Sequence, residues 1–421
     1  MTPIVTSKPL LEFAGKPIIR HQIKAAQQAG LDQFVIVANK NNFVDLKTAV
    51  KGLHKVKMEF AIQEKPKGMA DAILTASNLL SDEPFILFGS DDIVESAAFS
   101  RLINAYEKTN DCFGYITTFQ VLNYFPGGYL VIDGNGEIQH IVEKPRRGEE
   151  PSKFINIVLH LFNHPQRLFD YLRRTETDAD DSYEKTLDRL IQEGNRTRAV
   201  EYKGTWQTIK YPWHILEAMD FLLKPLKRQI SPSAQISDRA LIDGNVVIED
   251  NVSVLEGAII RGPTYIGRNS IIGNNVLIRQ ANLGDNCVIG FNTEIKHSWI
   301  GNRCWFHSNY IGDSVIEDDC SFGAGTVTAN LRLDNTGIKV IVGDDKIETG
   351  NDKLGAFVGK GSRFGIHDSL LPGIKVGAGS LVGAHVYLTN NLPSGTMALA
   401  ESKYRVLPYR ADIDDDKQKL F

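Results

Sequence analysis

The chain has little cysteine, no long apolar run and no large excess of charge of one sign. Its 421 residues include four cysteines and no C-x-x-C pair, which argues against a disulfide framework or a cysteine zinc site and indicates a reducing, cytoplasmic compartment. No secretory signal and no apolar stretch of membrane-spanning length is present, so we expect no membrane partner. The net charge of −4 gives no reason to expect nucleic acid as a partner.

The second half of the chain instead contains a repeat of six residues. A large aliphatic residue recurs at every sixth position from Ile230 to Ile278, continues with occasional five-residue steps to Phe322, and resumes from Val358 to Leu388. A period of six fits neither an α-helix nor an alternating strand. Each hexad is one short strand and a turn, and three hexads close a triangular coil with the aliphatic residues inside. The repeat therefore predicts a parallel β-helix.

Two further features fit this β-helix. Cys287, Cys304 and Cys320 each lie two positions before a repeat residue, so we expect them at equivalent, buried points of successive coils. The hexads lapse over residues 326–352, which predicts a loop that leaves the β-helix there.

The first half of the chain alternates helical and strand patterns. We expect helices over residues 17–28, 44–50 and 70–80, and strands over residues 34–37, 58–62 and 85–88. Such alternation is typical of a parallel sheet covered on both faces. A β-rich stretch over 112–142, with a hairpin turn at 133–136, and helical regions over 164–194 and 212–223 follow. We therefore expect an α/β domain over residues 1–228, the β-helix over 229–410 and a flexible, solvated tail over 411–421.

Several motifs of the first domain resemble those of the sugar-1-phosphate nucleotidylyltransferases. They are Ser7-Lys8-Pro9-Leu10-Leu11, the Q-x-x-x-x-G-x-A stretch at 63–70, Phe88-Gly89-Ser90-Asp91, Glu143-Lys144-Pro145 and Asn156. The resemblance implies a Rossmann-like α/β nucleotidyltransferase fold that binds a sugar 1-phosphate and a nucleoside triphosphate, UTP or dTTP. It assigns Mg²⁺ to Asp91, and it places Lys8, Gln63, Gly68, Lys144 and Asn156 in the nucleotidyl site. A carboxylate at the end of a parallel strand suits Mg²⁺, and Lys144 suits a phosphoryl group; taken alone, both residues also fit ordinary strand ends.

Three departures from that family's pattern predict an impaired nucleotidyl site. The chain begins at Met1-Thr2-Pro3, which corresponds to a point just after the family's G-x-G-T-R loop, so we expect the first strand and that loop to be missing. Thr208 stands where the family's W-x-D motif has a metal-binding Asp, and a neutral hydroxyl replaces a carboxylate poorly on Mg²⁺. Val158 replaces the Gly of the sugar-binding N-x-G motif.

The β-helix resembles the acetyltransferase half of the bifunctional N-acetylglucosamine-1-phosphate uridylyltransferase/glucosamine-1-phosphate acetyltransferases. The residues that carry this resemblance lie at 294–296, 307–314 and 322–330. The segments 330–334 and 353–357 are more similar to the archaeal-type members. The resemblance implies a left-handed β-helix, a homotrimer of such helices and acetyl-CoA bound in the grooves between them.

Acetyl transfer to an amine needs a base, because the nitrogen loses a proton as the C–N bond forms. His307 is the candidate, since an unperturbed imidazole titrates near pH 6.5; the alternative is a turn histidine. The resemblance assigns the sugar phosphate to Lys296 and Tyr310, and the sugar to Asn330 and Lys339. Ser321 replaces a polar family Asn. The residues that we expect to contact CoA phosphates are Lys360, Arg363 and Lys375, and those that we expect to be surface groups are His297, His367 and His385.

The sequence therefore predicts an enzyme that N-acetylates an amino-sugar 1-phosphate of the glucosamine-1-phosphate type with acetyl-CoA, joined to a truncated or impaired nucleotidylyltransferase domain. One alternative is that uridylyl or thymidylyl transfer is the main activity of a full-length parent. Another is a non-catalytic regulatory subunit that assembles with an active paralogue, and a third is a β-helix that serves only as a structural spacer.

Overall fold

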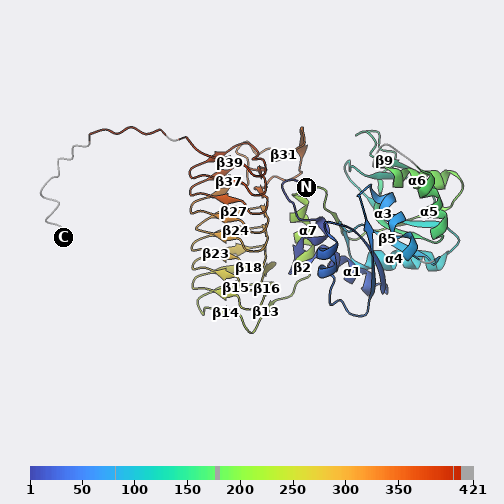
Figure 1. Ribbon diagram of the computed structural model, residues 1–421, viewed down its shortest axis with the longest axis horizontal. Helices are drawn as coiled ribbons and strands as arrows, with labels where there is room; N and C mark the ends of the chain where they lie inside the picture. The colour runs from blue at the N-terminus through green and yellow to red at the C-terminus, as the bar shows by residue number, and fades with distance from the viewer. Residues whose placement is uncertain (81, 176–180, 402, 409–421) are drawn as a thin grey trace.

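The computed structural model describes residues 1–80, 82–175, 181–401 and 403–408. It forms an α/β domain beside a column of stacked short strands (Figure 1). The tail expected over residues 411–421 lies outside the described residues. Among the residues that are described, no helix combines the length and the apolar character needed to cross a membrane.

The first domain contains the predicted helices and strands and one helix that was not predicted. Its helices are α1 (Ile18–Gln28), α2 (Phe43–Ala49), α3 (Met69–Ala76), α4 (Ser96–Lys108), α5 (Pro165–Arg174), α6 (Ser182–Gln192) and α7 (His214–Leu223). Its longer strands are β3 (Gln33–Asn39), β4 (Lys57–Gln63), β5 (Phe85–Phe88), β6 (Asp92–Val94), β7 (Gly114–Gln120), β8 (Gly128–Ile132), β9 (Ile138–Glu143), β10 (Phe154–Phe162), β11 (Thr197–Glu201) and β12 (Trp206–Thr208). The unpredicted helix is α4, which buries Ala98, Phe99 and Leu102.

Among the described residues, the strands of the first domain form one large sheet and three separate pairs, which are β3 with β4, β6 with β12, and β1 (Glu12–Phe13) with β2 (Lys16–Pro17). The large sheet has the order β11-β7-β10-β8-β9 with β5 also on β10. The parallel pairing of β3 and β4 agrees with the expected parallel sheet. β11 and β7 are also parallel, but the long strand β10 runs antiparallel to β5, β7 and β8. The described residues contain no ladder between β3 and β5, so the sheet is mixed and divided.

The hexapeptide repeat folds as predicted, into three parallel sheets. The first is formed by β13 (Gln229–Ile230), β16 (Val246–Ile248), β19 (Thr264–Ile266), β22 (Asn282–Leu283), β25 (Trp299–Ile300), β28 (Val315–Ile316), β33 (Phe357–Val358) and β36 (Lys375–Val376). The second includes β20 (Ile271–Ile272), β26 (Trp305–Phe306), β29 (Ser321–Phe322), β34 (Arg363–Phe364) and β37 (Leu381–Val382). The third includes β18 (Ile259–Arg261), β21 (Leu277–Arg279), β24 (Glu294–Lys296), β27 (Tyr310–Gly312), β30 (Val327–Thr328) and β35 (Ser369–Leu370).

The interior of the β-helix is a stack of repeat residues. Phe306, Phe322 and Phe364 stack on successive coils, with ring centroids 4.9 and 4.4 Å apart. The three repeat-domain cysteines are buried beside this stack, which confirms their predicted role. The predicted loop is also confirmed, because β31 (Lys339–Val342) and β32 (Asp345–Glu348) form a hairpin outside the three sheets.

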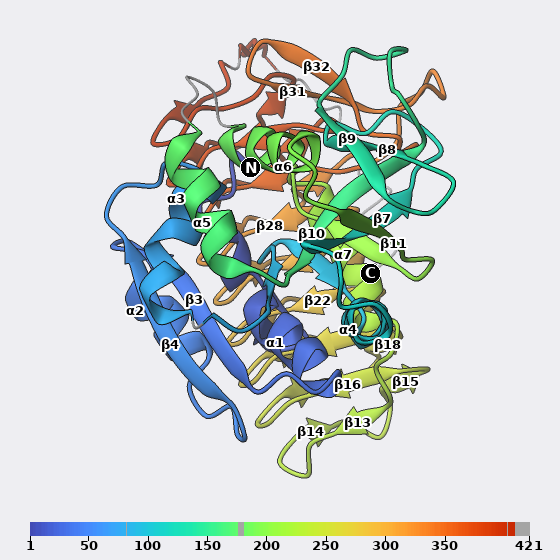
Figure 2. The same cartoon turned by 90° about the vertical axis from the view of Figure 1, so that its right-hand side faces the viewer.

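One face of the β-helix is covered by the first domain. We call the outer side of the first sheet the docking face; its apolar side chains are Val247, Tyr265, Trp299, Val315 and Phe357, and they are buried with residues of α7 and the N-terminal segment. Figure 2 shows the first domain in front of this face.

Polar contacts complete the docking. The Trp299 indole N–H donates to the carbonyl of Glu12 at 2.8 Å. The backbone N–H groups of Val5 and Thr6 donate to the buried carboxylate of Glu317 at 2.8–3.0 Å. Because buried polar groups need partners, these bonds fix how the two domains meet.

Candidate functional site

The third sheet places several of the predicted acetyl-transfer residues on adjacent rungs. β24 and β27 pair in parallel, with Lys296 opposite Gly312. The residues that follow these strands, His297 and Asp313, both adopt left-handed backbone conformations with φ of 43° and 48°. Asp and His tolerate this conformation better than most residues, and it turns both side chains toward the same corner of the β-helix.

Asp313 is the centre of this corner. Its carboxylate accepts hydrogen bonds from Lys296 Nζ at 2.8 Å, from His297 Nδ1 at 2.9 Å and from Asn330 Nδ2. Its side chain is only 6% exposed. Burial alone would raise the pKa of Asp313, but the bonds from His297, Lys296 and Asn330 hold it below its usual value. Asp313 is therefore an ionised anchor for three donors.

The corner unites most of the predicted sugar-site residues. Asn330 Nδ2 also donates to the hydroxyl of Tyr310 at 3.1 Å. We call Lys296, His297, Tyr310, Asp313 and Asn330 the corner cluster. Three of its members were predicted; Asp313 belongs to the predicted motif but was not assigned a role.

His307 lies on the preceding turn, three residues before Tyr310. Its side chain is exposed, and its backbone N–H donates to the Asn309 side chain at 2.6 Å. The third sheet thus carries the candidate base at one edge and the corner cluster at the other. Lys339 lies apart on β31, where it pairs with Glu348 at 2.9 Å.

The prediction that His297 is a surface group is wrong. Its side chain is 24% exposed, and its Nε2 atom lies 3.1 Å from the Asp220 carboxylate of α7. Burial lowers the pKa of His297, but the hydrogen bonds to Asp220 and Asp313 outweigh it and raise the pKa to about 9. Sequence spacing gave no signal for this contact, because Asp220 belongs to the other domain. His367 and His385 are exposed, as expected.

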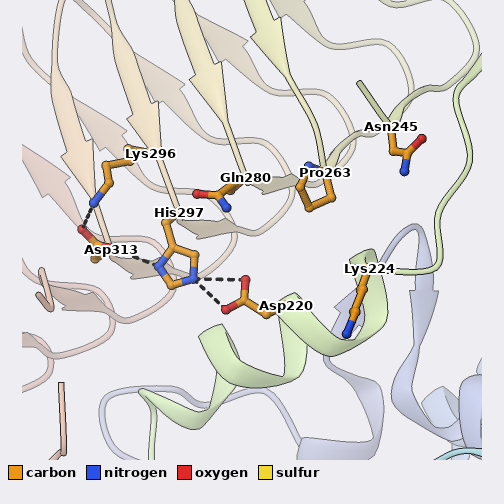
Figure 3. Close-up of a pocket in the computed structure, with 8 residues that line it drawn as sticks. All are labelled: Asp220, Lys224, Asn245, Pro263, Gln280, Lys296, His297 and Asp313. Carbon is orange, nitrogen blue, oxygen red and sulfur yellow. Dashed lines mark hydrogen bonds and ion pairs between the residues drawn. The ribbon is translucent and has the colours of Figure 1, made fainter. Parts of the chain in front are cut away.

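A cavity of about 480 Å³ lies between α7 and this corner of the β-helix. Figure 3 shows His297 between Asp313 and Asp220, with Lys296 above Asp313 and joined to it by a dashed line. The remaining residues that line the cavity are Lys224, Asn245, Pro263 and Gln280. The corner cluster therefore borders an open space that α7 partly encloses.

The three candidate contacts for CoA phosphates are not brought together. Lys375 is 8% exposed on the docking face, and burial lowers its pKa. Arg363 is exposed on the second sheet, and Lys360 Nζ lies 3.9 Å from Asp319. Arg363 and Lys360 remain accessible to a ligand, whereas Lys375 is covered.

The substitution Gly312→Ala tests the corner cluster without altering a core side chain. A Cβ atom at this position would lie 2.7 Å from the Tyr310 hydroxyl and 2.8 Å from Asn330 Nδ2. We expect Gly312→Ala to fold, because only the ends of two side chains must move, and to lower acetylation by roughly ten- to a hundredfold through their displacement. Acetylation kinetics and circular dichroism check this prediction. Gly134→Ala, which meets no atom within 4 Å, is the control, and unchanged kinetics for Gly312→Ala would contradict the assignment.

The first domain holds a second polar site at the ends of its strands. Lys8 Nζ lies 2.7 Å from Asp91 Oδ2. The neighbouring Asp92 accepts a hydrogen bond from the Trp206 indole at 2.9 Å. Burial and the nearby Asp91 carboxylate raise the pKa of Asp92 to about 6. The sequence motifs predicted no role for Asp92, although it follows Asp91 directly.

The other predicted nucleotidyl residues have local contacts of their own. Gln63 is buried and bonds to the carboxylate of Asp71 and the carbonyl of Gly68, and Gly68 has the positive φ of 88° that favours glycine. A side chain at Gly128 would collide with Asn156, so this glycine leaves space beside Asn156. Lys144 pairs with Glu143 at 3.1 Å.

Lys210 is a further cation at this centre that the sequence analysis missed. Its ammonium group lies 4.0 Å from the centre of the Phe125 ring and donates to the Pro126 carbonyl. Burial lowers the pKa of Lys210 to about 8, against the opposing effect of Asp92 and Glu143. The spacing of Lys210, two residues after Thr208, is the only sequence signal for it.

The side chains at this centre are consistent with a metal ion that takes one ligand, Asp91, from the protein. Asp91 is about one-third exposed, and Mg²⁺ commonly binds one or two carboxylates together with substrate phosphates. Thr208 lies opposite Asp92 across the β12–β6 ladder and supplies no charge. Among the described residues, no group of three or more His, Cys, Asp or Glu side chains could hold a metal ion.

Comparisons with known proteins find similarity in both domains. A family model for nucleotidyl transferases matches residues 3–224, and a model for bacterial transferase hexapeptides (six repeats) matches residues 245–280. The chain is 32% identical over 399 residues to a bifunctional sugar-1-phosphate nucleotidylyltransferase/acetyltransferase of Sulfurisphaera tokodaii, covering 90% of this chain and 91% of the relative. It is 30% identical to the bifunctional protein GlmU of Methanocaldococcus jannaschii, covering 92% and 91%.

The chain is therefore a transferase of the nucleotidyl transferase family, with a β-helix of hexapeptide repeats at its C-terminal side. Within that family it belongs with the bifunctional sugar-1-phosphate nucleotidylyltransferase/acetyltransferases, which it matches along most of its length.

Proposed function

We propose that the β-helix N-acetylates an amino-sugar 1-phosphate of the glucosamine-1-phosphate type with acetyl-CoA. The observation that carries this proposal is the bonding of Lys296 and Asn330 to Asp313, with Asn330 also bonded to Tyr310. The exposed His307 precedes Tyr310 by three residues. Lys296 supplies a cation for the phosphate, and Tyr310 and Asn330 supply hydrogen bonds for the sugar.

The chemistry needs one base. The neutral amine attacks the thioester carbonyl, the C–N bond forms and the C–S bond breaks. His307 takes the proton that leaves the nitrogen, and the CoA thiolate is released. The exposed imidazole of His307 is open to a substrate that approaches along the third sheet.

The first domain is proposed to bind a nucleoside triphosphate and a sugar 1-phosphate for nucleotidyl transfer. Asp91 would hold a divalent metal, which would neutralise phosphate charge. Lys8, Lys144 and Lys210 would contribute positive charge, and Asn156 would contact the sugar. Thr208, which replaces a metal-binding Asp, and Val158, which replaces a Gly near the sugar, favour a low rate of nucleotidyl transfer at this site. They also favour the second candidate, in which this domain senses a sugar nucleotide as part of a regulatory subunit.

Thiol release tests the acetylation proposal. The chain is incubated with acetyl-CoA and glucosamine 1-phosphate, and free CoA thiol and N-acetylated product are measured together. We expect stoichiometric formation of both. No acetylation of any amino-sugar 1-phosphate tried would favour the regulatory candidate.

Self-association is part of this proposal, with a homotrimer as the expected state. The uncovered second sheet exposes Ile271, Trp305 and Leu381 to 43%, 53% and 38%, and the turns next to it expose Phe291 and Ile366 to 61% and 46%. Such apolar groups on one side of a molecule support an interface, and this one would lie next to His307.

Trp305 tests this interface. We expect Trp305→Glu to weaken the trimer at least tenfold, because the interface would bury an unpaired charge, and to lower acetylation at dilute protein concentration. Light scattering over a concentration series is the measurement, with Leu241→Glu on another face of the β-helix as the control. A parent that stays monomeric at micromolar concentration would remove the trimer from the proposal.

A further inference from the structure

A chain of hydrogen bonds joins the first domain to the corner cluster. Asp220 on α7 contacts His297 Nε2 at 3.1 Å, and His297 Nδ1 contacts Asp313 Oδ1 at 2.9 Å. Asp313 then holds Lys296 and Asn330, and Asn330 reaches Tyr310. α7 thus lies two hydrogen-bonded side chains away from the proposed sugar contacts (Figure 3).

The geometry defines the protonation of His297. Both ring nitrogens face carboxylates, and a neutral imidazole has only one N–H to donate. The imidazolium form satisfies both contacts, and it is flanked by an anion on each side. His297 also has a positive φ, a conformation that costs energy for a non-glycine residue and persists where its surroundings hold it.

From this geometry we infer that His297 is a positioning residue for the acetyl-transfer site, and that α7 of the first domain holds it there through Asp220. This inference rests on the proposed acetylation at the same site. It means that acetylation by the β-helix depends on a side chain of the other domain. Asp220 and His297 act through Asp313; neither is assigned a contact with the substrate.

The charged groups around His297 define the expected pH dependence. They are Asp220 and Lys224 from α7, Lys296 at the end of β24 and Asp313 at the end of β27; the other residues that line the cavity are uncharged. We call the hydrogen-bonded series Asp220–His297–Asp313 the strut. The pKa of His297 is raised to about 9, so the strut is intact at neutral pH and is lost as the pH rises through that value. We therefore expect acetylation to decline on the alkaline side near that pH.

Asp220→Asn removes the charge of one of the two carboxylates that contact His297 and keeps the shape of the side chain. We expect kcat for acetylation to fall roughly two- to thirtyfold and the alkaline limb of the pH profile to move down by about one unit or more, because one of two stabilising carboxylates is gone. Asp220 is 56% exposed, so the fold should survive. Glu256→Gln, which loses an exposed pair with Arg239 on a different corner, is the control and should leave the limb in place.

His297→Asn provides the second test, because Asn suits a left-handed turn and has no proton to lose. We expect its acetylation rate to be reduced and its profile to lack the alkaline limb that His297 causes. Nitrogen-15 spectra of labelled histidine should show both ring nitrogens of parental His297 protonated at pH 8.

The outcomes separate this inference from the proposed function. A parent that acetylates, with an Asp220→Asn variant whose alkaline limb stays at the parental pH, would overturn the inference and leave the proposed function standing. A neutral His297 ring at pH 8 would overturn it as well. A parent that acetylates no amino-sugar 1-phosphate would remove the proposed function, and the positioning role with it.

Discussion

Replacing His307 with Ala is expected to lower the acetylation rate by roughly two to four orders of magnitude, the usual contribution of a general base. The ring is exposed and makes no hydrogen bond to another described residue, so its removal leaves no buried group unpaired. The neighbouring core residues Phe306 and Ile311 stay in place. The measurement is thiol release from acetyl-CoA at saturating amino-sugar 1-phosphate.

The controls for this variant address binding and assembly. CoA affinity by calorimetry and the oligomeric state by light scattering should match the parent. The variant should also lose the acidic limb of the pH profile, because that limb reports protonation of the base in the parent. Acetylation within a few-fold of the parental rate would assign the base to another residue.

Sequence patterns predicted the β-helix because its signal is local. Each hexad has one large aliphatic residue at its repeat position. The sequence alone therefore predicted that Ile260, Ile278 and Ile295 lie in the interior. The repeat did not group Lys296, Tyr310 and Asn330 into one site; only the resemblance to known acetyltransferases did so. That resemblance also supplied their roles.

The docking of the two domains was not predicted, although part of its signal is in the repeat. Val247, Tyr265 and Trp299 occupy the outward position of β16, β19 and β25, with the polar Asn282 at that position on β22 between the last two. Large side chains of this kind at outward positions mark a face that needs a partner. The pattern does not say which helix covers that face. The contact between Asp220 and His297 depends on that choice, and His297 was therefore misread as a surface group.

The helix α4 and the mixed first-domain sheet were also missed, for a different reason. The residues 96–108 form an amphipathic helix that buries Ala98, Phe99 and Leu102. β10 has the apolar pattern of an ordinary strand, and this pattern does not show whether a strand runs parallel or antiparallel to its neighbours. Alternating helices and strands favoured a parallel sheet for residues 17–88, and the pattern did not show that β5 of that segment pairs antiparallel with β10.

Thr208→Asp is expected to destabilise the first domain unless a divalent metal is present. Thr208 is buried and lies opposite Asp92 on β12 and β6, with Asp91 adjacent to Asp92. A third carboxylate here would be a buried charge without a partner, which costs about 3–5 kcal/mol. For a domain of this size the thermal midpoint should fall by roughly 6–20 °C in the presence of a chelator.

Millimolar Mg²⁺ should restore part of this loss, because an ion that binds only the folded state stabilises it. The rise in the midpoint on adding Mg²⁺ should be larger for Thr208→Asp than for the parent, as followed by scanning calorimetry. Thr208→Asn has a similar shape without the charge and separates the cost of the charge from that of the fit. A variant as stable as the parent without metal would mean that the carboxylate at 208 points away from Asp91 and Asp92. A variant that is destabilised and does not respond to Mg²⁺ would mean that these residues do not form a metal site, and the first domain would then be better described as a site that binds a sugar nucleotide through Lys8, Lys144 and Lys210.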